Sequence, residues 1–266
     1  MRNIILVTGA TSGFGLATAE RLASAGHTVY GTGRRPFQHP AIHFLQMDVR
    51  DPQAIASVVD HIVSHEGRLD VVLNNAGMGI GGALELATDD EIRLQMETNF
   101  MGCVNVCRAV LPHMRRQRSG KLINVSSVGG VMGLPYQGFY SASKFAIEGF
   151  SEALAAEVRG FGIAVCLVEP GDFATGFTAS RRNSQATLDS DAYGESFRRS
   201  LALIEKEELG GMRPDRLAKK IERIVASRRP RFRYVVAGGE QWLSVAVKRV
   251  LPGNWFVSIL RNYYKV

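Results

Sequence analysis

The sequence has little cysteine and no long apolar run. Its three cysteines, Cys103, Cys107 and Cys166, are an odd number without CxxC spacing, so neither a disulfide framework nor a zinc site is indicated. No stretch offers the roughly 18 uninterrupted apolar residues of a membrane-spanning helix, and Met1–Val7 lacks the longer apolar region and cleavage site of a signal peptide. We therefore expect a soluble, cytoplasmic protein in a reducing compartment.

Internal repeats, low-complexity tracts and dividing linkers are also absent. The histidines His43, His61, His65 and His113 show no metal-ligand spacing, so we expect no metal site. Charged residues make up 21% and the AVILMFWYC set 45% of the chain, which is the usage of a globular protein. Because α/β folds often reach 266 residues as one unit, residues 1–266 are predicted to form a single domain.

The positive charge does not identify a partner by itself. The net charge of +7 would suit nucleic acid, an anionic membrane surface or an anionic cofactor. Two basic runs, Arg115–Arg118 and Arg228–Arg233, lie near predicted helix ends, where cations are favoured by the helix dipole and are usually solvated. We therefore expect no nucleic-acid partner.

Strand and helix patterns alternate along most of the chain. Strands are predicted at seven short apolar segments: Ile4–Val7, Thr28–Thr32, His43–Met47, Val71–Leu73, Lys121–Val125, Ile163–Val168 and Tyr234–Val236, the last at an edge. Helices are predicted over Leu16–Ala25, from Asp51-Pro52, from Thr88, over Thr98–Gln117, Phe139–Gly160 and Phe197–Glu208, and from Pro214. This order indicates a doubly wound, Rossmann-type parallel sheet covered on both sides.

Two regions have weaker patterns. The polar stretch Thr178–Ser190 is predicted to be a mobile loop. It lies within residues 172–212, the region in which a fold of this kind usually forms its substrate-binding pocket. Residues 238–266 interleave apolar and basic side chains in a helical segment. This segment either packs on the body and pocket or meets a partner chain or, weakly, a membrane surface.

A glycine-rich turn follows the first predicted strand. In Thr8-Gly9-Ala10-Thr11-Ser12-Gly13-Phe14-Gly15, three glycines let the backbone turn tightly, approach a pyrophosphate and begin a helix whose positive end faces the anion. The spacing GxxxGxG differs from the GxGxxG of long-chain dehydrogenases. An ordinary glycine loop is the alternative.

A second motif combines a tyrosine with a lysine. In Tyr140-Ser141-Ala142-Ser143-Lys144, the spacing of four puts a phenol and an ammonium on one helix face, where Lys144 can stabilise a tyrosinate. Ser127 lies thirteen residues upstream of Tyr140, at the end of a predicted strand. Its hydroxyl can point toward the carbonyl group with which Tyr140 would exchange a proton, and Ser126 is the alternative for this role.

Together these motifs resemble the short-chain dehydrogenase/reductase family over about residues 3–236, in particular its 17β-hydroxysteroid and retinol dehydrogenase-like branch. The resemblance implies a catalytic tetrad of Asn99, Ser127, Tyr140 and Lys144. In the family, Ser orients the substrate oxygen, Tyr exchanges its proton, Lys binds the nicotinamide ribose and lowers the Tyr pKa, and Asn holds a water.

The resemblance also implies a set of cofactor-binding residues. These are Gly9, Thr11, Ser12, Gly13, Phe14 and Gly15 of the turn, Asp48 and Val49 near adenine, Asn75, Ala76 and Gly77 of an NNAG motif, Tyr140 and Lys144, and Pro170, Gly171, Phe173 and Thr175 of a PGxxxT segment. Asn74 and Asn75 could instead cap a turn through their side chains.

The end of the second predicted strand favours NADP(H) over NAD(H). NAD-preferring members carry an acidic residue there that would repel a 2′-phosphate. Gly33 occupies this position, and Arg34 and Arg35 follow it with guanidinium groups suited to phosphate, unless both are merely solvated. Ser12 could add a hydroxyl.

The predicted function is therefore NADP(H)-dependent interconversion of a secondary or primary alcohol with a ketone or aldehyde (EC 1.1.1.-). The expected substrate is an apolar small molecule of steroid, retinoid or lipid type, and the expected assembly is a homodimer or homotetramer. A non-catalytic NADP-binding or sensing module is the alternative, which the complete tetrad argues against.

Overall fold

The computed structural model describes residues 2–266, which build a seven-stranded parallel sheet of order β3-β2-β1-β4-β6-β7-β9. Its strands are β1 (Ile4–Thr8), β2 (Thr28–Gly33), β3 (His43–Gln46), β4 (Val71–Asn74), β6 (Gly120–Val125), β7 (Ile163–Pro170) and β9 (Arg233–Val236). The strand order reverses between β1 and β4, where a doubly wound sheet opens a crevice at the carboxyl ends of its strands. The predicted fold class is confirmed, and β9 is an edge strand as predicted.

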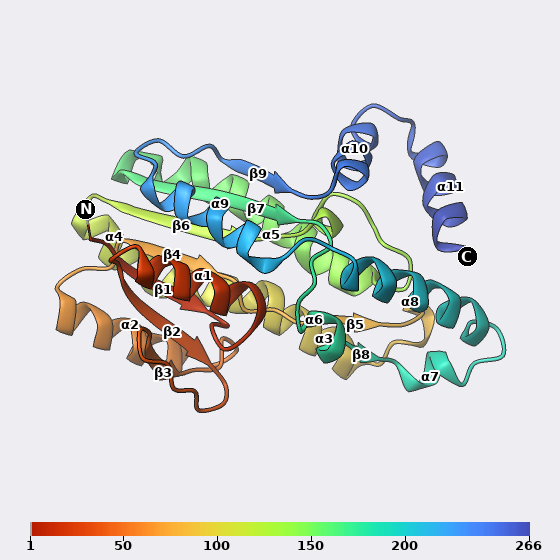
Figure 1. Cartoon of the computed structure of the whole chain (residues 1–266), viewed down its shortest axis with the longest axis horizontal. Coiled ribbons are helices and arrows are strands. Elements are labelled where there is room, and N and C mark those ends of the chain that lie inside the picture. Colours follow the sequence, from red (N-terminus) through yellow and green to blue (C-terminus); the bar gives the residue numbers. More distant parts are fainter. Residues whose placement is uncertain (1) are drawn as a thin grey trace.

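Helices cover both faces of this sheet (Figure 1). Two helices, α1 (Gly13–Ser24) and α9 (Pro214–Ala226), pack on one face, and α2 (Pro52–Glu66), α4 (Gly102–Gln117) and α5 (Gly138–Val158) pack on the other. The strands β1 and β4 are buried along their whole length, which explains why they are apolar on both sides.

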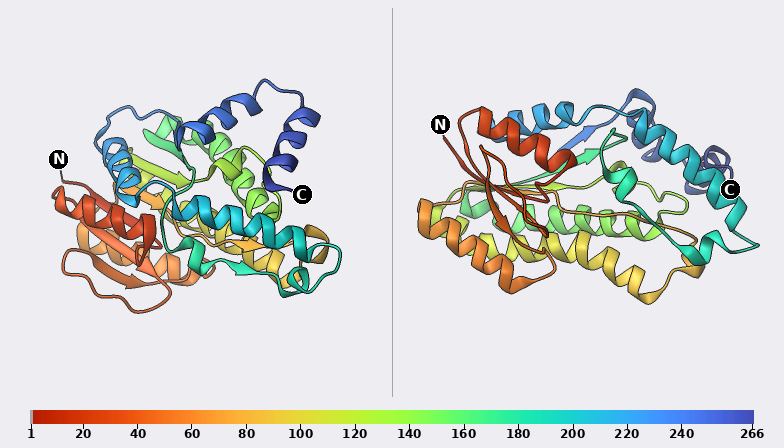
Figure 2. Two further views of the ribbon diagram at one scale, coloured as in Figure 1. Left: turned by 45° about the vertical axis from the view of Figure 1, so that its right-hand side comes forward. Right: turned by 60° about the horizontal axis from the view of Figure 1, so that its bottom comes forward.

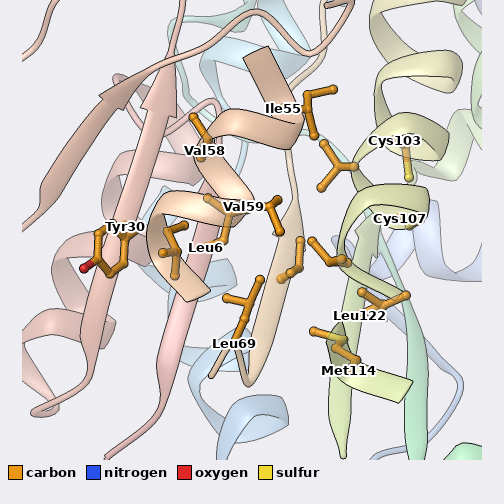
Figure 3. Packing of buried hydrophobic residues seen from close by; sticks show 14 of the residues in the cluster. Leu6, Tyr30, Ile55, Val58, Val59, Leu69, Cys103, Cys107, Met114 and Leu122 are labelled. Atoms are coloured by element: carbon orange, nitrogen blue, oxygen red, sulfur yellow. The ribbon is translucent and has the colours of Figure 1, made fainter. Parts of the chain in front are cut away.

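The largest of the three core clusters lies under α2, α4 and α5. Leu6 and Leu122 of the sheet face Ile55 of α2 and Met114 of α4, and all four side chains are fully buried (Figure 3). Each such side chain contributes about 1.5–3 kcal/mol when it leaves water. This packing holds rigid the strand ends that carry the site.

The helix predicted over Thr98–Gln117 belongs to a longer helical run. α3 (Asp89–Met96) begins with a capping box between Thr88 and Glu91, continues through a π-helical turn at Glu97–Met101 and leads into α4. A π turn inserts an extra residue and rotates the side chains that follow it. Here it contains the buried side chain of Asn99.

The prediction of a mobile loop over Thr178–Ser190 is wrong. This stretch contains α6 (Phe177–Ser180), β8 (Arg182–Asn183) and α7 (Gln185–Leu188), and β8 pairs in parallel with β5 (Ile80–Gly81). Backbone hydrogen bonds from Arg182 to Gly79 and from Ser184 to Gly81 measure 3.0 and 2.8 Å. A pairing of two residues, so distant in sequence, leaves no periodic apolar pattern for sequence reasoning to detect.

The remaining helices gather at the end of the molecule toward which β7 and β9 point (Figures 1 and 2). They are α8 (Gly194–Leu209), α10 (Gly239–Lys248) and α11 (Gly253–Tyr264), the last two within the predicted helical segment of residues 238–266. Within residues 2–266, every helix is too short or too polar to span a bilayer.

Candidate active site

A cavity of about 550 Å³ opens at the carboxyl ends of the strands. Of the residues that the sequence singles out for catalysis or cofactor binding, all but Gly15 and Asn99 line it. The cavity runs from the glycine turn after β1, past Tyr140 on α5, to α8 and the C-terminal helices. Segments far apart in the sequence thus meet around one space.

The glycine turn has the shape that a pyrophosphate requires. Gly9 and Gly13 have φ angles of +66° and +53°, in the left-handed region that favours glycine. A Cβ added at Gly15 would lie 2.0 Å from the Gly9 carbonyl oxygen, so Gly15 serves the close packing of the turn and not the cavity wall. α1 has no acidic residue in its first turn and no side-chain cap from Ser12, which leaves its first N–H groups free for an anion.

Asn75 and Thr8 hold the glycine turn against the end of β4. The Asn75 Nδ2 donates to the carbonyl oxygens of Thr8 and Gly9 at 2.9 and 3.1 Å. The Thr8 hydroxyl accepts the backbone N–H groups of Asn75 and Ala76, both at 3.0 Å. These hydrogen bonds join the loop after β4 to the end of β1 and to the glycine turn, so Asn75 does not cap a turn of its own, the alternative that the sequence left open.

Two arginines mark one end of the cavity. Arg34 and Arg35 are exposed, line the cavity and form no ion pair with any carboxylate in residues 2–266. A Cβ added at Gly33 would lie 2.7 Å from Thr11 Cγ2, so an acidic side chain there would have to displace Thr11. The Asp48 carboxylate, which the resemblance assigns to adenine, pairs with Arg50 at 2.6 Å.

Tyr140, Ser127 and Lys144 converge near the middle of the cavity. The side chains of Tyr140 and Ser127 both lie next to Gly129. A Cβ added at Gly129 would lie 3.3 Å from Tyr140 Cε1 and 3.5 Å from Ser127 Oγ, so these two side chains are close to each other. The Lys144 Nζ lies 5.8 Å from the centre of the Tyr140 ring and donates to the Val125 carbonyl at 2.9 Å. The predicted tyrosine, serine and lysine are therefore neighbours.

Burial governs the protonation of this group. It raises the pKa of Tyr140 to about 12, against a lowering effect of the Ser127 hydroxyl. It lowers the pKa of Lys144 from 10.5 to about 8, because a charged ammonium is less stable away from water. The expected lowering of the tyrosine pKa is thus not found, and at neutral pH Tyr140 is a phenol able to donate a proton.

Ser127 fits the serine role better than Ser126. The Ser127 hydroxyl influences the pKa of Tyr140 and accepts the Gly129 N–H at 3.0 Å. Ser126 also lines the cavity, but its Oγ is buried without a hydrogen-bond partner among residues 2–266, and it lowers the pKa of Glu148 and not that of Tyr140. The alternative left open by the sequence is thereby disfavoured.

Asn99 lies behind the cavity wall. Its Nδ2 donates to the Met78 carbonyl and to Ser143 Oγ, both at 3.0 Å, and its Oδ1 accepts the Met78 N–H at 2.8 Å. Ser143 Oγ in turn donates to the Tyr140 carbonyl at 2.6 Å. In this structure, Asn99 connects the loop after β4 to the helix that carries Tyr140.

Sequence reasoning missed the carboxylates at the other end of the cavity. Asp172, Glu207, Glu208 and Glu240 line it. Glu208 pairs with buried Arg181, whereas Asp172 receives a hydrogen bond from Gln241 and Glu207 one from Tyr263, both neutral donors. Burial and the neighbouring Glu207 and Glu208 raise the pKa of Asp172 to about 6. The only available signal was the position of Asp172 directly after the Pro170-Gly171 pair.

Apolar side chains form a wall of the cavity beside Tyr140 and these carboxylates. The Phe177 ring of α6 lies 5.8 Å from the Tyr140 ring, and Phe173 packs edge-to-face on Phe14 at 4.9 Å. Further apolar lining comes from Met132, Leu134, Ile204, Phe256, Ile259 and Leu260. The cavity can therefore hold a long apolar molecule that carries a small polar end.

Comparison with known proteins identifies the same family that the sequence motifs resemble. The family model described as short chain dehydrogenase matches residues 3–186, and the chain belongs to this family of oxidoreductases. A solved short-chain dehydrogenase from Streptomyces avermitilis is 33% identical, covers 100% of this chain and 97% of its own, and superposes with a TM-score of 0.83.

Three curated relatives narrow the comparison. The 3-ketodihydrosphingosine reductase of Bacteroides thetaiotaomicron is 54% identical over 264 residues, 99% of this chain and 98% of the relative. Retinol dehydrogenase 8 of Bos taurus is 34% identical, covering 86% of this chain and 80% of the relative. The 17-beta-hydroxysteroid dehydrogenase type 1 of Homo sapiens is 39% identical, covering 66% and 58%. The predicted resemblance to the steroid and retinol branch is confirmed.

The pKa of Lys144 predicts how carbonyl reduction varies with pH. Since the folded-state pKa is lowered to about 8, the ammonium is present below that pH and is lost above it, while Tyr140 stays protonated to about 12. The turnover rate should be constant near pH 6–7 and fall about tenfold per unit well above pH 8. A pH–rate profile, with circular dichroism to monitor folding, checks this. A rate that stays flat to pH 10 would contradict a required Lys144 ammonium.

Proposed function

We propose that this protein reduces the ketone of a long-chain 2-amino-3-ketone, of which 3-ketodihydrosphingosine is the type, with NADPH. The full-length identity of 54% to a reductase of that name carries the proposal. It is supported by a cavity that combines Tyr140, Ser127 and Lys144 with an apolar wall and carboxylates. Each of these three parts matches one part of such a substrate.

The proposed reaction turns a ketone and NADPH, with one proton, into a secondary alcohol and NADP⁺. When bound, the nicotinamide supplies a hydride to the carbonyl carbon. The Tyr140 hydroxyl donates its proton to the carbonyl oxygen as the negative charge develops there. Ser127 orients that oxygen, and the buried Lys144 ammonium stabilises the tyrosinate left behind.

The cofactor is proposed to lie between the glycine turn and Tyr140. The free N–H groups at the start of α1 would hold the pyrophosphate. Arg34 and Arg35, which have no carboxylate partner among residues 2–266, would hold the 2′-phosphate of NADPH. The crowding between Gly33 and Thr11 disfavours the acidic residue that NAD-specific members use.

The substrate is proposed to lie between Tyr140 and the C-terminal helices. Its ammonium, next to the ketone, would pair with Asp172 or Glu207, which have only neutral hydrogen-bond donors. Its alkyl chain would lie along the apolar wall of residues 172–212 and α11. A cytoplasmic homodimer or homotetramer completes the proposal, with self-association supported by the exposed side chains of Met101 and Phe145.

Tyr140→Phe should lower the kcat for 3-ketodihydrosphingosine by about 10²- to 10⁴-fold, because the proton donor is removed while the ring remains. NADPH binding, followed by fluorescence titration, should change little. Tyr136→Phe is a matched control, since Tyr136 contacts Ser196 and does not line the cavity. Retention of more than a tenth of the wild-type rate would remove Tyr140 from the role.

The ratio of kcat/KM for NADPH over NADH should exceed unity in the wild type. Arg34→Ala and Arg35→Ala should each lower the ratio about tenfold or more, since a charge-assisted contact with phosphate is lost. Arg228→Ala is the control, because Arg228 is equally exposed but lies outside the cavity lining. A wild-type ratio at or below one would overturn the NADPH assignment.

Asp172→Asn and Glu207→Gln should raise the KM for the amino ketone about tenfold or more, because each removes a charge that faces the ammonium. The KM for the same long-chain ketone without its amine should stay within about twofold. Glu205→Gln, on the same helix but outside the cavity lining, is the control. An equal rise in KM for both ketones would show that the carboxylates do not bind the amine.

A further inference from the structure

The last two helices and the turn between them leave several large apolar side chains in solvent. We define the C-terminal apolar surface by its exposed members: Trp242, Leu243, Val250, Trp255, Val257, Ile259 and Tyr263. Val250 is 79%, Trp255 67% and Trp242 56% exposed. These are among the most exposed large apolar side chains in residues 2–266, and they gather within 22 residues of sequence, Trp242–Tyr263. Such a concentration marks an interaction surface.

The helix α11 divides its apolar residues between two faces. Phe256, Leu260 and Tyr264, spaced by four, pack inward against the body of the protein. Trp255, Ile259 and Tyr263, also spaced by four, form the adjacent exposed face. The inward face is sufficient to dock the helix, so packing of this chain does not explain the exposed one.

Most charges of this segment have one sign, and α10 contains a single exposed acid, Glu240, in its first turn. From Gln241 to Val266 the sequence contains Lys248, Arg249, Arg261 and Lys265 and no Asp or Glu side chain. Arg249, Arg261 and Lys265 are exposed, and Lys248 lies 4.9 Å from the Phe256 ring centre. Tryptophans, aliphatic side chains and an excess of cations over acids are the composition of a helix that lies in the interface of an anionic bilayer.

The same helix forms part of the cavity wall. Ile259 and Tyr263, each about half exposed, line the cavity together with Phe256, Leu260 and Tyr264. The C-terminal apolar surface therefore adjoins the cavity through Ile259 and Tyr263. In Figures 1 and 2, α10 and α11 lie at the outer end of the molecule, where a flat surface could reach them.

We propose that α10 and α11 dock on an anionic lipid bilayer and hold the mouth of the cavity against it. The apolar side chains enter the boundary of the acyl chains while the four cations pair with lipid phosphates and carboxylates. Docking itself is independent of the substrate. Its use, to let a membrane-borne long-chain ketone pass into the cavity without crossing water, rests on the proposed function.

Vesicle binding by the full-length protein, without substrate, tests the docking. Trp242 and Trp255 are the only two tryptophans of the chain, so intrinsic fluorescence reports directly on this surface. Phosphatidylcholine vesicles containing phosphatidylserine should shift the emission to shorter wavelength and sediment the protein, whereas phosphatidylcholine alone should bind it much more weakly. Binding should weaken as salt is added.

Variants separate the apolar from the electrostatic contribution. Trp255→Ser should reduce the partition coefficient about tenfold, and Arg249→Gln with Arg261→Gln should reduce it about twentyfold, since each cation near an anionic surface is worth roughly fivefold. Leu209→Ser removes an equally exposed side chain outside the segment and should bind like wild type. Circular dichroism of each variant checks that it is folded.

Two results would overturn the proposal. One is the absence of any vesicle-dependent shift or sedimentation. The other is a dimer, seen by analytical ultracentrifugation, that Trp255→Ser dissociates, because the surface would then be covered by a second copy of the chain. Failure of the proposed function would look different, since vesicle binding would persist while 3-ketodihydrosphingosine was not reduced.

Discussion

The buried ammonium of Lys144 is the constraint on which the site depends. An ammonium away from water must be hydrogen-bonded, and the Val125 carbonyl at the end of β6 meets this need at 2.9 Å. This contact ties α5 to the sheet. Tyr140 lies one helical turn before Lys144 and Ser127 two residues after Val125, so one contact sets both side chains beside the cavity. Ser143, bonded to Asn99 and to the Tyr140 carbonyl, holds the same turn of the helix.

The charges of the cavity are separated along its length. Arg34 and Arg35 lie at the end near the glycine turn, whereas Asp172 and Glu207 lie at the end near α8 and α11. Neither pair is neutralised by an ion-pair partner within residues 2–266. An anionic ligand group therefore gains an ion pair at the arginine end, and a cationic group gains one at the carboxylate end. A group of the opposite charge is repelled at each end. Tyr140 lies between the two ends, where a neutral carbonyl is expected.

How well the site could be predicted depended on how local each signal was. The glycine turn, the Tyr140–Lys144 pair and the strand-helix alternation each depend on residues close together in sequence. The sequence alone therefore predicted the fold and the residues that meet at the centre of the candidate site. The carboxylates come from the loop after β7 and from α8, and no spacing relates Asp172 to Glu207. The same holds for β8, whose partner β5 lies about a hundred residues earlier. Only the folded chain brings such groups together.

The C-terminal segment shows a third limit of sequence reasoning. Its apolar and basic residues were evident, but their division between faces was not, because every position of α11 from Trp255 to Ile259 is apolar except Ser258. The structure buries only Phe256 and Tyr264 of this helix. So little buried apolar area makes local opening inexpensive compared with unfolding of the sheet. For the proposed substrate this weakness would be an advantage, since a long alkyl chain cannot pass a wall that is packed as tightly as the core.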